Sequence, residues 1–311
     1  ITINSLTDNS GVTTPSNQLP APVFITMHAN PNVDFSTSTP EICFDDPAIL
    51  NFNFIAGNPP FSIDYSINSN NQTPLTINGS GNQQYTITPD PIVGLNSYDI
   101  INITDGNGCV GVPNPNNASI LVNPTPDINI TVSGTNPICQ GQDSELFFPV
   151  ISGTPPFNVN YLAGGSPLTT NVDGSGNPTS GNPMIISPTS TTTYTLTSVT
   201  DAKGCVNSLS NSAILTVNEI PNVIVSGDTE ICNQDQTPLF FTFTSGTAPW
   251  TVNYNVASSP GSVTLYNTND TLMVDPNITT TYIFTAINDN NCSATINEDV
   301  TALSKGNTNL S

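Results

Sequence analysis

The chain has almost no positive charge. Its 311 residues include 2 Lys+Arg against 23 Asp+Glu, for a formal net charge of −21 at pH 7. Proteins bind nucleic acids by placing Lys and Arg against phosphates, so this composition excludes a nucleic-acid partner. An anionic membrane surface would repel the chain for the same reason.

Long apolar runs are absent as well. No stretch approaches the roughly 20 residues of a membrane helix, and no signal peptide opens the sequence. We therefore expect no direct membrane insertion. Because Ile1 is not a start residue, we also expect the sequence to be a piece of a longer protein.

Residues for catalysis are scarce. His28 is the single histidine and is expected in an apolar linker strand, VFITMHAN, so no Ser-His-Asp or Cys-His relay can be assembled around it. The acidic pair Asp45–Asp46 has no counterpart in the repeats described below, and the cysteines lack the paired spacing of zinc sites. The sequence predicts that the protein is not an enzyme.

One phrase occurs three times. It reads GNPPFSIDY from Gly57, GTPPFNVNY from Gly153 and GTAPWTVNY from Gly246, so its copies begin 96 and 93 residues apart. A Gly/Pro corner and an aromatic residue lead into strict alternation of apolar and polar residues, which is typical of a strand with one buried face. An apolar run precedes each phrase, and the two together resemble the B–C corner of an immunoglobulin sandwich.

The fold class expected is therefore all-β, with tandem immunoglobulin-like β-sandwich repeats forming an elongated rod. We divide the chain into the tail of a preceding repeat (1–30), repeat 1 (31–124), repeat 2 (125–219) and repeat 3 (220–311). Short Pro-containing linkers favour the rod because they restrict swinging. The predicted core anchors are the aromatics that open strands C and F: Phe61, Phe157, Trp250, Tyr98, Tyr194 and Tyr282. At the start of strand F a buried tyrosine can bond back to the backbone, as in a tyrosine corner.

The tail follows the same pattern. Its opening, ITINSLTDNSGV, aligns on YTLTSVTDAKGC from Tyr194, with Asp8 on Asp201 and Val12 on Cys205. Two strands cannot bury a core by themselves. We expect the missing strands to lie upstream or to come from another molecule.

The continuous stretch INITVSGTNPICQGQDSELFFPVISGTPPFNVNY, followed by PTSTTTYTLTSVTDAKGC, resembles a known family. It is similar to the immunoglobulin-like or PKD-like repeats of large Bacteroidetes secreted surface proteins, a class that includes gliding-motility adhesins exported by the type IX pathway. The resemblance covers the whole chain and implies a long, cell-surface, multi-repeat stalk or adhesin. The C-terminal sorting domain of such proteins is not in this sequence.

Six cysteines stand at regular places, which suits an oxidising, extracellular compartment. The obvious disulfides lie within a repeat, such as Cys43–Cys109. However, the first cysteine of a repeat falls in the A–B turn and the second in the F–G turn, at opposite ends of a sandwich and about 25 Å apart. A disulfide allows a Cα separation of at most about 7 Å. Pairing between successive repeats, Cys43–Cys205 and Cys139–Cys292, is slightly preferred over pairing within a repeat. Cys109 and Cys232 would then pair with repeats outside this chain.

Several polar residues are weaker candidates for a site. Asp105, Asp201 and Asp289 precede the second cysteine of each repeat and are candidate calcium ligands, although an Asx turn explains them better. No other cofactor is expected. Thr271, in Asp270-Thr271-Leu272, is a glycosylation candidate that resembles a Bacteroidetes O-glycosylation motif. Sequons at Asn78 and Asn277 are expected by chance, and Lys203 and Lys305 are expected to be solvated rather than to form isopeptide bonds.

The function expected is an extracellular structural and adhesive stalk on a bacterial cell surface. Its expected partners are cell-surface or extracellular ligands, including glycans, and the other repeats of the same long chain. Two alternatives stay open: a subunit of an extracellular filament, and a carbohydrate-binding module of a secreted protein. The second needs an exposed aromatic platform, for which Tyr65, Tyr161 and Tyr254 are the candidates.

Overall fold

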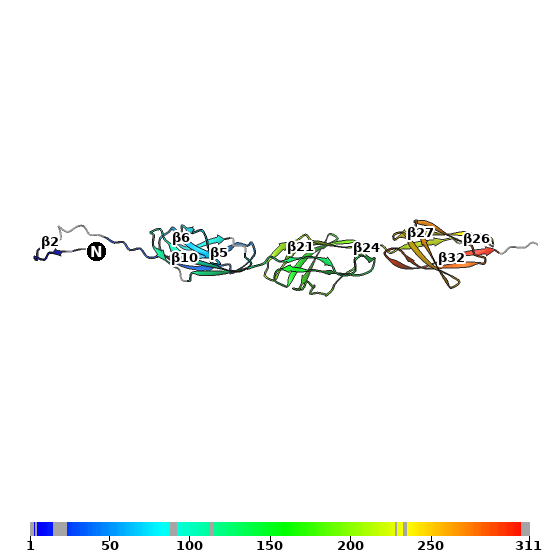
Figure 1. Cartoon of the computed structure of the whole chain (residues 1–311), viewed down its shortest axis with the longest axis horizontal. Coiled ribbons are helices and arrows are strands. Elements are labelled where there is room, and N and C mark those ends of the chain that lie inside the picture. Colours follow the sequence, from blue (N-terminus) through cyan, green and yellow to red (C-terminus); the bar gives the residue numbers. More distant parts are fainter. Residues whose placement is uncertain are drawn as a thin grey trace, which may run out of the picture. The chain divides into compact units, whose positions relative to one another are not determined.

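A computed structural model describes residues 3, 5–14, 24–87, 92–111, 115–227, 229–232 and 235–305. Its secondary structure is β-strand (Figure 1), as the sequence predicts. No helix in these ranges has the length and apolar character needed to cross a membrane. The chain divides into two compact units, residues 1–124 and 125–311, and each is described by itself.

Repeat 1 is a sandwich of two sheets. One sheet has the order β3-β5-β9, and the other has the order β4-β12-β10-β6-β7, with β8 on β6 and β11 on β10. The strands are β3 (Asn32–Thr37), β4 (Glu41–Cys43), β5 (Ala48–Ala56), β6 (Phe61–Ile67), β7 (Asn70–Asn71), β8 (Leu75–Ile77), β9 (Gly81–Ile87), β10 (Gly94–Thr104), β11 (Val110–Gly111) and β12 (Asn117–Asn123).

Repeat 2 has the same order of strands in a more interrupted form. Pro149, which lacks a backbone N–H, separates the two halves of its second long strand. The strands are β13 (Asp127–Ile128), β14 (Thr131–Val132), β15 (Ile138–Cys139), β16 (Ser144–Phe147), β17 (Val150–Ser152), β18 (Phe157–Ala163), β19 (Ser166–Val172), β20 (Met184–Ile186), β21 (Thr192–Thr200), β22 (Val206–Ser208), β23 (Ser212–Leu215) and β24 (Val217–Asn218).

Repeat 3 has the sheets β25-β27-β30 and β26-β32-β31-β28-β29. The strands are β25 (Asn222–Ser226), β26 (Thr229–Cys232), β27 (Thr237–Ser245), β28 (Trp250–Val256), β29 (Ser259–Leu265), β30 (Asn269–Val274), β31 (Thr280–Asn288) and β32 (Ser293–Lys305).

All three sandwiches share one detail of topology. The short strand that ends in the first cysteine pairs in parallel with the last strand of its own repeat: β4 with β12, β15 with β24, and β26 with β32. The other long pairings are antiparallel. This parallel pairing places each first cysteine beside the point where its repeat ends.

Each repeat has its own hydrophobic core. The three clusters of buried residues run from Val33 to Val122, from Ile128 to Leu215 and from Val223 to Ala302, so each falls inside one of the predicted repeats. All six predicted core anchors are buried. Phe61 stacks on Phe54 with ring centroids 3.9 Å apart, and Trp250 stacks on Phe243 at 4.1 Å.

The repeated Gly of the phrase has a physical cause. Gly153 has a φ of 107°, which favours glycine. A Cβ at this position would lie 2.8 Å from the ring of Phe157 and 2.9 Å from Cα of Pro126. A Cβ at Gly57 would lie similarly close to Pro31, and a Cβ at Gly246 would lie similarly close to Pro221. The phrase therefore requires glycine because its corner packs closely against the first proline of its own repeat.

In the described residues, two of the three tyrosines do not form the hydrogen bond of a tyrosine corner. In the described part of the chain, the hydroxyls of Tyr194 and Tyr282 donate no hydrogen bond to the backbone, although both side chains are buried. Burial raises the pKa of each phenol because it disfavours the charged form. Their contribution is apolar packing at the start of strands β21 and β31.

The tail contains the hairpin that the alignment predicts. Strand β1 (Leu6–Thr7) pairs with β2 (Thr13–Thr14). Asp8 closes the turn by accepting the N–H groups of Ser10 and Val12 at 2.9 and 3.1 Å. Residues 24–30, interpreted above as an apolar strand around His28, form no strand and are exposed. Among the residues that the structure describes, no strand pairs with them to satisfy their backbone groups.

Candidate functional site: a disulfide junction between repeats 2 and 3

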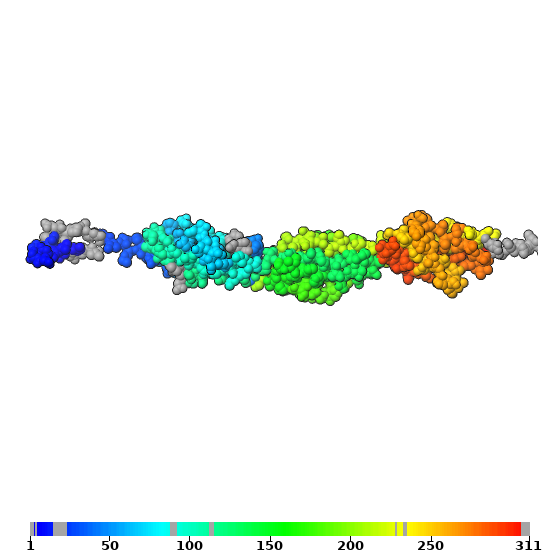
Figure 2. All heavy atoms as spheres, in the orientation of Figure 1, coloured from blue at the N-terminus to red at the C-terminus, as the bar shows by residue number. Residues whose placement is uncertain are grey.

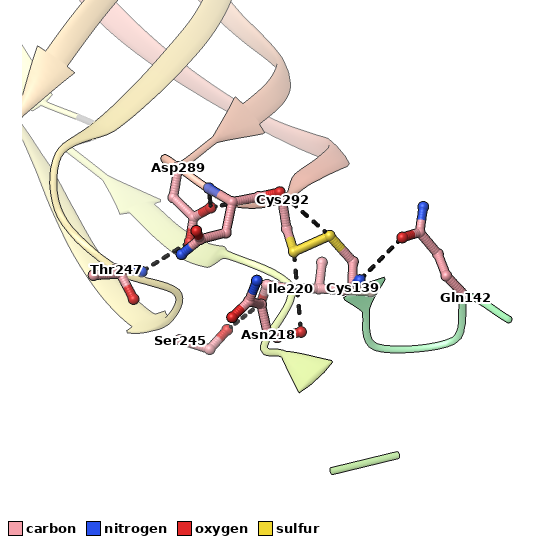
Figure 3. Close-up of a disulfide and its surroundings, with 9 residues drawn as sticks. Cys139, Gln142, Asn218, Ile220, Ser245, Thr247, Asp289 and Cys292 are labelled. Atoms are coloured by element: carbon pink, nitrogen blue, oxygen red, sulfur yellow. Dashed lines mark hydrogen bonds between the residues drawn. A yellow bond between two sulfur atoms is a disulfide. The ribbon is translucent and has the colours of Figure 1, made fainter. Parts of the chain in front are cut away.

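Cys139 and Cys292 are joined by a disulfide with a Cα–Cα distance of 5.8 Å and a sequence separation of 153 residues (Figure 3). Cys139 ends β15 in repeat 2, and Cys292 lies in the F–G turn of repeat 3, between β31 and β32. The bond connects successive repeats, as the topological reasoning from the sequence slightly preferred. Figure 2 shows this junction from outside, where the yellow-green end of repeat 2 adjoins the orange-red part of repeat 3.

The pairing within a repeat is absent in the described residues. Cys139 and Cys292 are bonded to each other, so neither bonds the other cysteine of its own repeat. Cys109 and Cys232 are free thiols, which leaves no Cys43–Cys109 or Cys232–Cys292 bond. The predicted Cys43–Cys205 pair would link the two units of the chain, and it stays a prediction.

The Cys139 turn is held from both sides. Strand β15 pairs in parallel with β24 by aligning Cys139 with Asn218. Gln142 completes the turn: its backbone N–H donates to the Cys139 carbonyl at 3.0 Å, and its side-chain Oε1 accepts the Cys139 N–H at 2.9 Å. The sulfur is therefore presented by a turn that is fixed to the end of repeat 2.

The Cys292 turn is held by Asp289. One carboxylate oxygen, Oδ1, accepts the N–H groups of Asn291 and Cys292 at 2.8 and 2.6 Å. The other, Oδ2, accepts the N–H of Thr247 at 2.8 Å, in the B–C corner of the same repeat. We call this three-bond arrangement the aspartate clamp, because one carboxylate fixes the F–G turn to the B–C corner.

The clamp recurs in the other two repeats. Asp201 accepts the N–H groups of Lys203, Cys205 and Thr154 at 2.9, 3.0 and 3.0 Å. Asp105 accepts those of Asn107, Cys109 and Asn58 at 2.9, 2.9 and 3.0 Å. The Asx turn was predicted from the sequence, but the third bond, to the B–C corner, was missed. The two bonded residues are 47 positions apart in repeats 1 and 2 and 42 apart in repeat 3, so a fixed sequence interval does not mark the third bond.

The hydrogen bond from Asn58, together with those from Cys109 and Asn107, holds the pKa of Asp105 below its ordinary value. Asp105 and Asp201 have exposed fractions of 4% and 6%, so water competes little for their oxygens. Both carboxylates therefore act in the folded protein as acceptors for backbone N–H groups.

These contacts bear on the calcium candidates. Each of the three clamps directs backbone N–H groups at both carboxylate oxygens, whereas a calcium site needs several oxygens facing one point. In the ranges that the structure describes, no group of three or more His, Cys, Asp or Glu residues is arranged to hold a metal ion. Calcium binding by these residues stays a hypothesis to be tested in solution.

A concavity lies beside the disulfide. It has a volume of about 640 Å³ and is lined by residues of both repeats, among them Gln140, Asn218, Ile220 and Asn290. The carbonyl oxygen of Asn291 lies 3.4 Å from Cys139 Sγ, and that of Asn218 lies 4.0 Å from Cys292 Sγ. Because a disulfide sulfur carries no hydrogen, both are S···O contacts rather than hydrogen bonds.

The aromatic platform candidates lie mainly in the cores. Tyr161 is buried, and Tyr65 is partly buried against the core of repeat 1. Tyr254 packs against Tyr282 and Phe284 at centroid distances of 6.1 and 5.7 Å. It also lines a surface concavity of about 420 Å³ with Asn253, Asn255, Pro260, Gly261, Ser262 and Thr285. Tyr254 therefore borders a hollow on the surface.

The remaining candidates are exposed. Thr271 lies in β30, opposite Phe240 of β27, and is solvent-accessible, as are Asn78 and Asn277. Lys305 forms an ion pair with Glu230, and the hydrogen bond from this pair raises the pKa of the lysine. His28 and the Asp45–Asp46 pair lie apart from the junction in sequence and belong to the other unit.

No family model matches the chain, and no curated protein matches it. Several solved structures are similar in fold. A 1.5-MDa bacterial ice-binding adhesin is 12% identical with a TM-score of 0.36, covering 89% of this chain and 97% of its own. The N-terminal eight Ig domains of Down syndrome cell adhesion molecule are 16% identical with a TM-score of 0.46, covering 89% and 37%. A marsupial T cell receptor is 10% identical with a TM-score of 0.37, covering 86% and 99%.

These likenesses are too distant to carry an argument about function. The class of the protein follows from its own strand order and from its three separate cores: the chain is a series of tandem immunoglobulin-like β-sandwiches.

Proposed function

We propose that this chain is part of a non-catalytic, extracellular adhesive stalk on a bacterial cell surface. The observation that carries the proposal is the Cys139–Cys292 disulfide, which joins two successive sandwiches covalently. Disulfides persist in oxidising compartments, so this bond supports a place outside the cytoplasm. The resemblance of the repeats to large Bacteroidetes surface proteins, including type IX-exported gliding-motility adhesins, supports attachment to the cell.

The surface is suited to this role. Asn, Ser and Thr keep the outer faces hydrated, while 2 Lys+Arg in 311 residues offer almost no cleavage sites to trypsin-like proteases. Contacts with ligands would come from the segments that differ most between repeats. These are 66–81, 163–181 and 256–269, which connect strand C to strand E in each sandwich.

Two experiments on the producing cell test the proposal. Antibodies against the folded chain should label intact, unpermeabilised cells, and electron microscopy should show the label on thin single tethers. Deletion of the gene should reduce attachment of the cells to surfaces. Labelling only after permeabilisation would contradict the proposal, and a regular polymer under the microscope would favour the extracellular filament instead.

A carbohydrate-binding module is the second candidate, and the hollow beside Tyr254 favours it. Amide and hydroxyl side chains next to an aromatic ring are groups that bind neutral sugars. A glycan array with the intact chain and with Asn253→Ala tests this function, because Asn253 lines the hollow and its truncation leaves the Tyr254 packing intact. Binding lost in the variant would support it, and no binding by either protein would contradict it.

A further inference from the structure

We propose that the Cys139–Cys292 disulfide carries tensile load past most of repeats 2 and 3, so that both sandwiches stay folded when the chain is pulled. The inference rests on the proposed stalk function, because only a tether is pulled at both ends. It depends on the order of residues along the chain rather than on how the repeats are oriented.

The path of the load follows from connectivity. Without the disulfide, tension entering at Thr125 passes through every residue up to Lys305. With it, tension passes from Thr125 to Cys139, across the sulfur atoms, and on from Cys292 to Lys305. The 152 residues between the two cysteines become a side loop that bears no tension.

The two segments that remain in the load path are short and contain extended strands. The first contains β13, β14 and β15, and the second is essentially the single strand β32, Ser293–Lys305. A strand rises about 3.3 Å per residue and a fully stretched chain about 3.6 Å. Pulling can therefore lengthen these segments only slightly, and no core has to open.

The shielded loop holds the parts with which a stalk would bind. It contains the core anchors Phe157 and Trp250 and the variable segments 163–181 and 256–269. The buried clusters of both repeats lie largely inside it, apart from Ile128, Ile130 and Ile138 before Cys139 and Val300 and Ala302 of β32. A ligand held on these segments would remain on a folded surface while the tether is under tension.

The two ends of the bond are anchored in matching ways. Cys139 is fixed to the end of repeat 2 by β24 and Gln142, and Cys292 is fixed to the B–C corner of repeat 3 by Asp289. Force on the bond is therefore passed to backbone that is hydrogen-bonded on both sides. A disulfide between two free loops would lack these hydrogen bonds.

Single-molecule stretching of the full chain tests the proposal, with handles attached at positions 125 and 305. In the oxidised chain the load path from 125 through Cys139 and Cys292 to 305 contains no other cysteine, and dithiothreitol opens every disulfide, so neither result depends on how the other cysteines are paired. In the oxidised chain we expect a total release of less than about 30 Å, given two short extended segments. After dithiothreitol, in the parent and in the Cys139→Ser/Cys292→Ser variant alike, we expect about 500 Å more, from roughly 3.5 Å for each residue of the loop.

The Cys109→Ser/Cys232→Ser variant is the matched control, since both thiols are free in the described structure. It should release as little as the oxidised parent. A release of several hundred ångströms from the oxidised parent, or equal releases before and after dithiothreitol, would overturn the proposal. The stalk function fails in a different experiment: absence of cell labelling or of an effect on attachment would contradict that function without changing the stretching result.

Discussion

Removing the carboxylate of Asp201 tests the aspartate clamp most sharply. In Asp201→Ala, the N–H groups of Lys203, Cys205 and Thr154 lose their acceptor together. A hydrogen bond to a charged group contributes about 1.5–3 kcal/mol, and contributions that share one acceptor are not additive. We expect the F–G turn and the B–C corner of repeat 2 to lose about 3 kcal/mol of local stability.

The same repeat offers a matched control. Asp173 makes an Asx turn of the same kind, with Oδ1 accepting the N–H groups of Ser175 and Asn177 at 2.8 and 2.9 Å, but no cross-loop bond to a B–C corner is described for it. Asp173→Ala should therefore cost about 1 kcal/mol. The difference of about 2 kcal/mol is the part that belongs to the third bond and to burial, and it corresponds to roughly a 30-fold change in an opening equilibrium.

Amide hydrogen exchange is the assay, because unfolding of a chain with several cores is not two-state. The Thr154 amide should exchange roughly 30-fold faster in Asp201→Ala than in Asp173→Ala. Asp201→Asn should release the Thr154 amide while leaving Lys203 and Cys205 protected, since one amide oxygen can keep their two bonds. Unchanged protection of Thr154 in Asp201→Ala would refute the clamp.

Three other predictions follow from the packing and the charges. Gly153→Ala should destabilise repeat 2 by about 2–4 kcal/mol in calorimetry, because a Cβ at a φ of 107° would lie 2.9 Å from Pro126 Cα; a neutral result would contradict the packing explanation. Trp250→Phe should change stability by less than about 1 kcal/mol, since the buried indole N–H has no hydrogen-bond partner in the described structure, whereas Trp250→Ala should cost about 3–5 kcal/mol. The pKa of Asp105 is lowered in the folded protein, so the stability that its carboxylate contributes should be complete above the ordinary pKa of 3.8 and lost as the pH falls below that value. Exchange of the Asn58 amide would detect this loss, and Asp105→Asn should abolish the pH dependence.

The sequence predicts the sandwich well because its signal is local and repeated. Alternation within Phe157–Tyr161 and the Gly/Pro corner before it are enough to place strands B and C. The positions of Cys139 and Cys292 in the order of strands were enough to favour a bond between repeats. That inference was possible because a strand is much longer than the Cα separation that a disulfide allows.

Other features depend on contacts that no local pattern announces. The bond from Thr154 to Asp201 joins residues 47 positions apart, and only the folded sandwich brings them together. Whether a tyrosine such as Tyr194 bonds back to the backbone depends on which acceptors the folded core places near its hydroxyl, and the sequence does not show these. Residues 24–30 have strand-like composition, but in the described part of the chain no strand pairs with them, and such composition alone does not produce a strand.

Peptide mapping of the oxidised protein under non-reducing conditions is the most direct test of the account. The structure predicts a cross-linked pair of peptides that joins Cys139 to Cys292, and alkylation of Cys109 and Cys232 as free thiols. Recovery of Cys139 linked to Cys205, or of Cys232 linked to Cys292, would show that each repeat closes on itself and would contradict the covalent junction on which the proposed tether depends.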